Sequence, residues 1–162
     1  MSLQKIEISS FQDKIEWLWE RVKDQDYYWD DLSRGNHMAL LSLLFDSSSE
    51  HFYNESGMVS ITSIQSNINA NIHFMLWDMK YPVKKILGEA RDIFRDLFSR
   101  YSLSRITATI PAINKGAVRL AVLLGMKFEG TMREAFLYKG QYYDIYIYAI
   151  LKREFEEKGK VN

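Results

Sequence analysis

The chain has 162 residues, of which 47% are apolar and 26% charged, and it contains no cysteine. These values are typical of one soluble globular domain, and they exclude disulfide scaffolds, thiolate zinc sites and cysteine nucleophiles. Lysine plus arginine (21) balance aspartate plus glutamate (21), which argues against a protein built mainly to bind the nucleic-acid backbone. We therefore expect a single domain over residues 1–162, with neither a metal site nor a nucleic-acid partner.

Charge is divided unevenly along the chain. Residues 1–81 carry a net charge of −6 and residues 82–162 carry +6. A basic second half suits a polyanionic ligand, whereas solvated helix faces paired with the acidic half are the alternative. The longest apolar stretch, residues 38–45, is far shorter than the roughly 20 residues of a membrane span, and the N-terminus lacks a signal-peptide segment. We expect a cytoplasmic protein without a membrane partner.

The first third of the chain predicts a short strand and two helices. Residues 5–9 alternate between polar and apolar, residues 11–24 place apolar side chains at helical spacing, and residues 35–45 form a second apolar helical segment. Aromatic residues gather on the first helix and its exit, which suits core packing or the surface of a homodimer. These aromatics are Trp17, Trp19, Tyr27, Tyr28 and Trp29.

Three strands and a long helix follow. Residues 50–54, 57–65 and 70–78 predict an antiparallel meander, because turn-rich segments separate them. Pro82 is favourable in the first turn of a helix, and residues 82–101 carry one long apolar stripe at 3.6-residue spacing.

The last third predicts a strand, a helix and a hairpin. The strand covers residues 105–110, and the helix is capped by Asn114 and ended by Gly125. A two-residue loop joins the hairpin strands 127–138 and 141–151. The element order is β-α-α-β-β-β-α-β-α-β-β, which predicts an α+β (mixed α/β) fold with about seven strands and four helices.

Residues 105–154 carry a pattern that a known family shares. Its positions are Pro111 at a strand end, Asn114, Ala117, Leu120, Gly125, Glu129-Gly130, Arg133 and the turn from Gly140 to Asp144. The pattern resembles the C-terminal half of the GNAT acetyltransferases, above all the group that acetylates the N-termini of ribosomal proteins. The resemblance extends upstream to about residue 50. It implies a mostly antiparallel twisted sheet, acetyl-coenzyme A as co-substrate, and a small-molecule or peptide amine as acceptor.

The resemblance fails in the loop that holds the coenzyme's diphosphate. Tyr81, Lys84 and Ile86 replace the family's (Gln/Arg)-x-x-Gly-x-(Gly/Ala) pattern. A helix N-terminus still lies there, and Lys84 and Lys85 supply side-chain charge in place of close backbone approach. The alternative is a non-catalytic binding or assembly module that has the fold and has lost ordinary coenzyme A binding. The residues implied to bind the coenzyme are Leu76, Trp77, Lys84, Lys85, Ile86, Leu87, Gly88 and Asn114.

The resemblance also implies particular roles around the reacting groups. Ala121 replaces the tyrosine that protonates the leaving thiolate in many members. A bulge near residues 75–77 would direct backbone N–H groups at the thioester carbonyl, and Asn114 would contact the pantetheine arm while capping its helix. His73 lies on the strand that carries the family's base, and we expect it to act as the general base. The alternative for His73 is a structural, hydrogen-bonded histidine.

Overall fold

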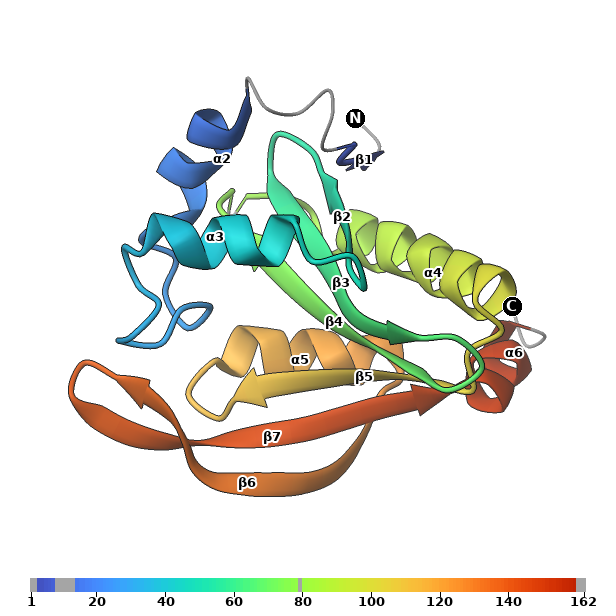
Figure 1. The fold of residues 1–162 in the computed structure, drawn as a ribbon. Coiled ribbons are helices and arrows are strands. Elements are labelled where there is room, and N and C mark those ends of the chain that lie inside the picture. Colours follow the sequence, from blue (N-terminus) through green and yellow to red (C-terminus); the bar gives the residue numbers. More distant parts are fainter. Residues whose placement is uncertain (1–2, 8–13, 79, 160–162) are drawn as a thin grey trace.

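Figure 1 shows the computed structural model of the protein, which describes residues 3–7, 14–78 and 80–159. Seven strands form one sheet in the order β1-β2-β3-β4-β5-β7-β6. The strands are β1 (Gln4–Lys5), β2 (Glu50–Tyr53), β3 (Gly57–Gln65), β4 (Asn69–Leu76), β5 (Arg105–Pro111), β6 (Lys127–Tyr138) and β7 (Gln141–Leu151). The helices within the described residues are α2 (Ile15–Val22), α3 (His37–Leu44), α4 (Val83–Arg100), α5 (Lys115–Leu124) and α6 (Lys152–Gly159).

The sheet is antiparallel except at its centre, where β4 runs parallel to β5. A parallel pair needs a crossover connection, and the long helix α4 supplies it. The β4–β5 pairing extends only from Asn69↔Arg105 to Asn71↔Thr107. Because β4 continues to Leu76 and β5 to Pro111, the two strands separate beyond these pairs, as Figure 1 shows.

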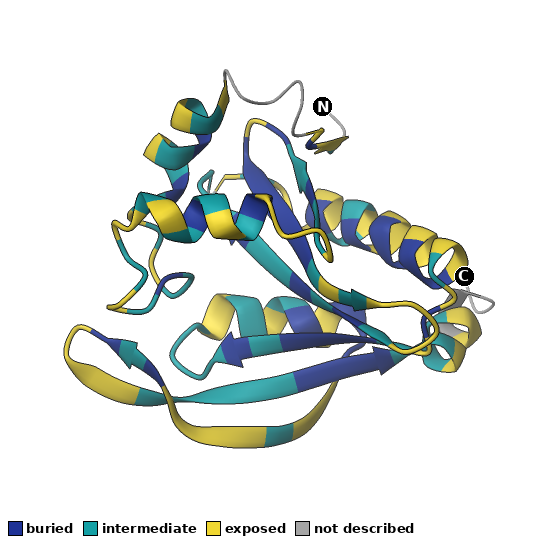
Figure 2. Ribbon diagram, viewed as in Figure 1, coloured by how far each residue is buried: buried dark blue, intermediate teal, exposed yellow. Residues whose placement is uncertain are grey.

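Side-chain alternation divides the core between the two faces of the sheet. Val59 and Ile61 of β3 pack with α4 and α5 on one face. Met58 of β3 and Met75 of β4 pack with α2 and α3 on the other face. Successive residues of a strand point to opposite faces, so β3 and β4 each contribute to both clusters. In Figure 2 the buried residues accordingly lie on the central strands and on the inner sides of the helices.

The predicted ends of the later elements are confirmed. Asn114 caps α5 by accepting from the N–H of Ala117 at 3.0 Å. Gly125 ends the helix with φ of 89°, in the left-handed region that glycine adopts without strain. The loop between β6 and β7 has positive φ at both Lys139 and Gly140, which is typical of a type I′ hairpin turn. Pro82 differs slightly, because it caps α4 in an extended conformation instead of occupying the first turn.

The two ends of the chain differ more from the predictions. A strand was expected over residues 5–9, and the structure has β1 at Gln4–Lys5 only. Residues 8–13 lie outside the described chain, and they include the start of the helix expected over 11–24. Helix α6 was not predicted, because its sequence contains one apolar side chain, Phe155, and so has no apolar periodicity. Phe155 packs against Phe94 and Phe98 of α4, with ring centroids 6.1 and 5.4 Å apart. No helix in the described chain has the length and apolar character to cross a membrane.

Candidate functional site

The separation of β4 from β5 leaves backbone groups of β4 directed toward β5 without a strand partner. The N–H of Trp77 donates to the carbonyl of Ser56 at 3.1 Å, so Trp77 faces β3. In an antiparallel ladder the residues that bond to one neighbour alternate with those that face the other side. The N–H of Leu76 is therefore directed toward β5, beyond the last β4–β5 pair.

A bulge at Trp77 and Asp78 follows β4, at the end of the range 75–77 that the resemblance implied. The N–H groups of Trp77 and Asp78 both donate to the carbonyl of Ser56 at 3.1 Å, so two residues face one on the partner strand. The backbone N–H of Trp77 is thus already bound, which differs from its expected role toward the thioester carbonyl. Its indole Nε1 also donates within the protein, to the carbonyl of Glu55 at 2.6 Å. Leu76 remains available for that role.

The side chain of Tyr81, which replaces the first residue of the family's phosphate loop, is turned toward β2. Its hydroxyl donates to Glu89 Oε1 at 2.7 Å and accepts from Asn54 Nδ2 at 3.2 Å. Asn54 directly follows β2, on the side of β4 away from β5. Tyr81 therefore does not fill the space between β4 and β5.

The start of α4 presents backbone N–H groups without an intrahelical partner and, within the described chain, one lysine whose side chain has no protein partner. The N–H groups of Lys85 and Ile86 bond to the Pro82 carbonyl at 2.8 and 3.1 Å, which leaves those of Val83 and Lys84 without an intrahelical partner. The Lys85 ammonium lies 4.9 Å from the centre of the Tyr81 ring, and a hydrogen bond to Tyr81 raises its pKa. Lys84 is exposed and, within the described chain, its side chain contacts no acidic or aromatic group.

The remaining predicted residues of this segment divide between core and surface. Ile86 is 7% exposed and faces the sheet beside Leu76, whereas Leu87 packs partly buried against the core. Gly88 is exposed, and a Cβ placed on it would meet nothing within 4 Å. Close packing against the protein therefore does not require a glycine at this position.

Asn114 lies at the start of α5, on the sheet face that α4 also covers. Its Oδ1 caps the helix. Within the described residues its Nδ2 donates to no protein atom, so one half of the amide is available to a ligand. The cap and the ligand contact that the sequence predicts thus use different atoms of the same side chain.

His73 lies on the opposite face of β4, beneath the connection between α2 and α3. Its Nε2 is 3.2 Å from Thr62 Oγ1, and its ring meets the Tyr28 ring edge-on with centroids 6.4 Å apart. Burial lowers the pKa of His73 below its usual range, and the nearby His51 lowers it further. The imidazole is therefore neutral at neutral pH, the form that a base requires.

The polar neighbours of His73 were not predicted from the sequence. Ser60 and Thr62 alternate with apolar residues on β3, and Ser60 pairs directly with His73 in the sheet register. Counting outward from the β3–β4 turn does not find this pair, because the register shifts by one residue between Thr62 and Gln65. Without that shift His73 would lie opposite Ile61. Tyr28 was assigned only to the aromatic group of the N-terminal helices.

The loop between α2 and α3 forms a wall on the His73 face by binding the tip of the β6–β7 hairpin. The Asp31 carboxylate accepts from the N–H groups of Lys139 and Gly140, both at 2.8 Å. The Tyr138 hydroxyl donates to Asp26, and that hydrogen bond lowers the pKa of Asp26. Figure 1 shows the loop and the hairpin tip side by side. These contacts join segments that are more than 100 residues apart in the sequence.

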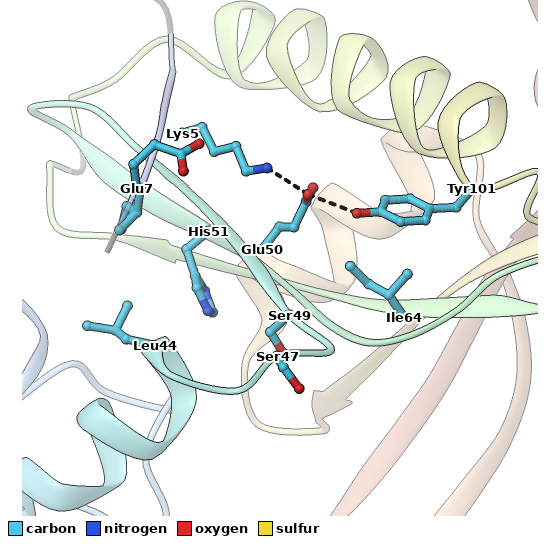
Figure 3. A pocket seen from close by; sticks show the side chains of 10 residues that line it. Lys5, Glu7, Leu44, Ser47, Ser49, Glu50, His51, Ile64 and Tyr101 are labelled. Atoms are coloured by element: carbon cyan, nitrogen blue, oxygen red, sulfur yellow. Dashed lines mark hydrogen bonds and ion pairs between the residues drawn. The ribbon is translucent and has the colours of Figure 1, made fainter. Parts of the chain in front are cut away.

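A cavity of about 410 Å³ lies at the other edge of the sheet and contains none of the predicted site residues (Figure 3). Its main charged group, Glu50, accepts from Lys5 at 2.8 Å, from Arg100 at 2.6 Å and from Tyr101 at 2.9 Å. Burial alone would raise the pKa of Glu50, but these hydrogen bonds outweigh it and lower the pKa to about 2. The cluster ties β1, β2 and α4 together, and its carboxylate is already satisfied. We therefore place the candidate site at the β4–β5 separation.

Comparison with known proteins identifies the fold. No protein-family model matches the chain, and no curated protein matches it by sequence. Spermidine N-acetyltransferase SpeG from Vibrio cholerae, solved with CoA and spermine, matches with a TM-score of 0.76 at 18% identity, over 96% of this chain and 97% of its own. A mutant of that enzyme gives 0.78 at 16% identity, over 98% and 99% of the two chains. A probable acetyltransferase gives 0.70 at 17%, over 88% and 89%.

These matches confirm the predicted fold class: the chain has the mixed α/β GNAT fold with a seven-stranded, mostly antiparallel sheet. At such identities the likeness concerns the fold. The finer likeness to the group that acetylates ribosomal proteins stays a prediction, as do the roles of the individual site residues.

Proposed function

We propose that the protein is an acetyl-coenzyme A dependent N-acetyltransferase that acts on a primary amine. The observation that carries this proposal is the separation of β4 from β5 after three residue pairs. It opens the middle of the sheet between a face covered by α4 and α5 and a face covered by α2 and α3. Two reactants can then approach one point from opposite faces, which is the geometry that acyl transfer requires.

The residues on the α4–α5 face fit the coenzyme. N–H groups without an intrahelical partner at the start of α4, with the Lys84 side chain beside them, suit a diphosphate. The Asn114 amide at the start of α5 suits the amide-containing pantetheine arm. The coenzyme would supply an acetyl group bound as a thioester. The net charge of +6 in residues 82–162, which include α4 and α5, favours this anionic ligand.

The residues around β4 fit the chemistry on the acceptor. His73 accepts a proton from the acceptor ammonium and frees the lone pair of the nitrogen. The N–H of Leu76, which is directed toward β5, would donate to the thioester carbonyl oxygen as that oxygen acquires negative charge. The acceptor enters from the face that α2 and α3 cover. These helices belong to residues 1–81, whose net charge of −6 favours a cationic amine. SpeG, which has the same fold, was solved with spermine, and a polyamine-like amine or a protein N-terminus fits this description.

The second candidate is a binding or assembly module without catalysis. In its favour, Lys84 and Ile86 stand where the resembled pattern has Gly and Gly/Ala. The orientation of Tyr81 toward Glu89 and Asn54 is against it, because the hydroxyl of the bulky replacement is held on the β2 side of β4, away from β5.

Calorimetric titration with acetyl-coenzyme A, with free coenzyme A as the control, tests the proposal. We expect saturable binding of both ligands. A mass-spectrometric assay with spermidine, a short peptide with a free N-terminus and its N-blocked counterpart then tests transfer. Acetylation of an unblocked amine supports the enzyme. Binding without transfer to any amine supports the module, and the absence of binding overturns the proposal.

A further inference from the structure

Buried polar residues form a row across the sheet behind His73. The strand registers place His51 opposite Ser60 and Ser60 opposite His73. Directly opposed residues on neighbouring strands project from the same face, so all three lie on the face that α2 and α3 cover. His51 and Ser60 are 3% and 1% exposed. Polar groups buried this deeply destabilise the fold unless hydrogen bonds compensate them.

The chemistry of the groups fixes the direction of these hydrogen bonds. His51 Nε2 lies 3.0 Å from the Leu43 carbonyl, which only accepts, so Nε2 carries a proton. Burial lowers the pKa of His51, and the neutral ring accepts at Nδ1 from Ser60 Oγ at 3.0 Å. The Ser60 hydroxyl thus donates to His51, and it also contacts the Tyr28 side chain. The chain of contacts runs from Tyr28 through Ser60 and His51 to Leu43.

This chain holds an aromatic ring against the imidazole of His73. The Tyr28 and His73 rings meet at 79° with centroids 6.4 Å apart. Burial raises the pKa of Tyr28 to about 12, so its hydroxyl stays protonated and does not compete with His73 for a proton. The titratable groups that face His73 are Tyr28, from the loop after α2, and His51, from β2.

Thr62 also contacts the imidazole of His73. Its Oγ1 lies 3.2 Å from His73 Nε2. A neutral imidazole carries one proton, on either Nε2 or Nδ1, and the contact of the other nitrogen selects the tautomer. If Nε2–H donates to Thr62, the lone pair lies on Nδ1, where it can accept a proton.

We infer that Thr62 and Ser60 are positioning residues for His73: Thr62 accepts the Nε2 proton and so makes Nδ1 the basic atom, while Ser60, backed by His51, fixes the Tyr28 ring against the imidazole. Nδ1 takes one proton from the acceptor ammonium and later releases it to water. The freed amine forms the N–C bond as the C–S bond of the thioester breaks, and its second proton passes to the leaving thiolate, which departs as coenzyme A. The inference rests on the proposed function for this catalytic step alone, because the tautomer is a property of the folded protein.

Nuclear magnetic resonance on histidine-labelled full-length protein reads the tautomer directly. Long-range proton–nitrogen correlations distinguish Nε2–H from Nδ1–H, and the spectrum of His73→Gln assigns the His73 signals. We expect Nε2–H in the wild type, a shift toward Nδ1–H in Thr62→Val, which removes the hydroxyl, and recovery in Thr62→Ser. A wild type with Nδ1–H, or a Thr62→Val protein with an unchanged tautomer, would overturn the assignment of Thr62.

Kinetics with the same variants test the catalytic consequence. We expect Thr62→Val and Ser60→Ala to lower kcat roughly 10-fold or more without changing the KM for acetyl-coenzyme A, with Thr62→Ser close to wild type. Thr131→Val, which removes an exposed hydroxyl on β6, is the matched control and should be normal. Circular dichroism and thermal unfolding check that each variant folds. An enzyme in which Thr62→Val turns over normally overturns the catalytic part of the inference. A protein that acetylates no amine refutes the proposed function, and the tautomer measurement still decides the role of Thr62.

Discussion

The Tyr81 hydroxyl donates at 2.7 Å to Oε1 of Glu89, which lies six residues after the start of α4. Tyr81 stands where the family has the first residue of its phosphate loop, and this contact fixes the ring on the β2 side of the helix. The ring in turn lies under the Lys85 ammonium, 4.9 Å away. Of the two lysines that the sequence offers in place of the missing glycines, Lys85 is thus engaged by the protein.

The two lysines should therefore differ in their effect on coenzyme binding. We expect Lys84→Ala to weaken acetyl-coenzyme A binding roughly tenfold, because an exposed ammonium next to the free N–H groups of α4 is lost. Lys85→Ala should have a smaller effect. Calorimetry at two salt concentrations measures both, and the affinity remaining in Lys84→Ala should depend less on salt. Equal affinities of Lys84→Ala and wild type would remove this lysine from the site.

His73→Gln should retain the fold and lose about 10²-fold in kcat/KM, because a positioned general base contributes at least that factor. Burial depresses the pKa of His73, and the base acts only when neutral. Activity in the wild type should therefore be lost as the pH falls through a value below the usual 6.5, and it should be flat above it. Near-normal turnover of His73→Gln, or a half-point above 6.5, would leave His73 as a structural residue.

Elements set by local sequence were predicted well. The apolar stripe of α4, the cap and C-terminal glycine of α5 and the Lys139-Gly140 turn each depend on neighbouring residues, and the structure has them where the sequence places them. Helix α6 escaped prediction because tertiary packing of Phe155 fixes it, not a periodic pattern.

The site was predicted only in part, because its arrangement depends on contacts between distant segments. The sequence gives no direct indication that Asp31 binds the hairpin turn at Gly140. The row of His51, Ser60 and His73 depends on two strand registers, and a slip of one residue would turn each side chain to the other face. Residue spacing alone does not encode such a row.

The Glu50 cluster predicts a pH-dependent contribution to stability. The folded pKa of Glu50 is about 2, below its model-peptide value of 4.5, so the carboxylate stabilises the fold above pH 4.5 and this contribution is lost as the pH falls toward 2. Glu50→Gln should reduce the free energy of unfolding at pH 7 by on the order of 3 kcal/mol, and the difference from wild type should shrink at pH 3.

Urea unfolding at pH 7, 5 and 3 measures this difference. Asp96→Asn is the matched control, because Asp96 binds the same Arg100 guanidinium at 2.6 Å with its side chain 52% exposed. Exposed pairs contribute little, so this variant should differ from wild type by less than about 1 kcal/mol. A Glu50→Gln protein with the same deficit at all three pH values would show that charge is not the cause.

Asn114 should serve the helix with one atom and the coenzyme with another. Its Oδ1 accepts from Ala117 N–H at 3.0 Å, and serine caps a helix about as well as asparagine. Asn114→Ala should therefore cost about 1 kcal/mol in unfolding free energy, while Asn114→Ser should cost little. The short serine hydroxyl does not reach the position of Nδ2, so Asn114→Ser should still bind acetyl-coenzyme A more weakly than wild type. Denaturation and calorimetry on the same two proteins separate the roles, and wild-type affinity in a folded Asn114→Ser would reduce Asn114 to a helix cap.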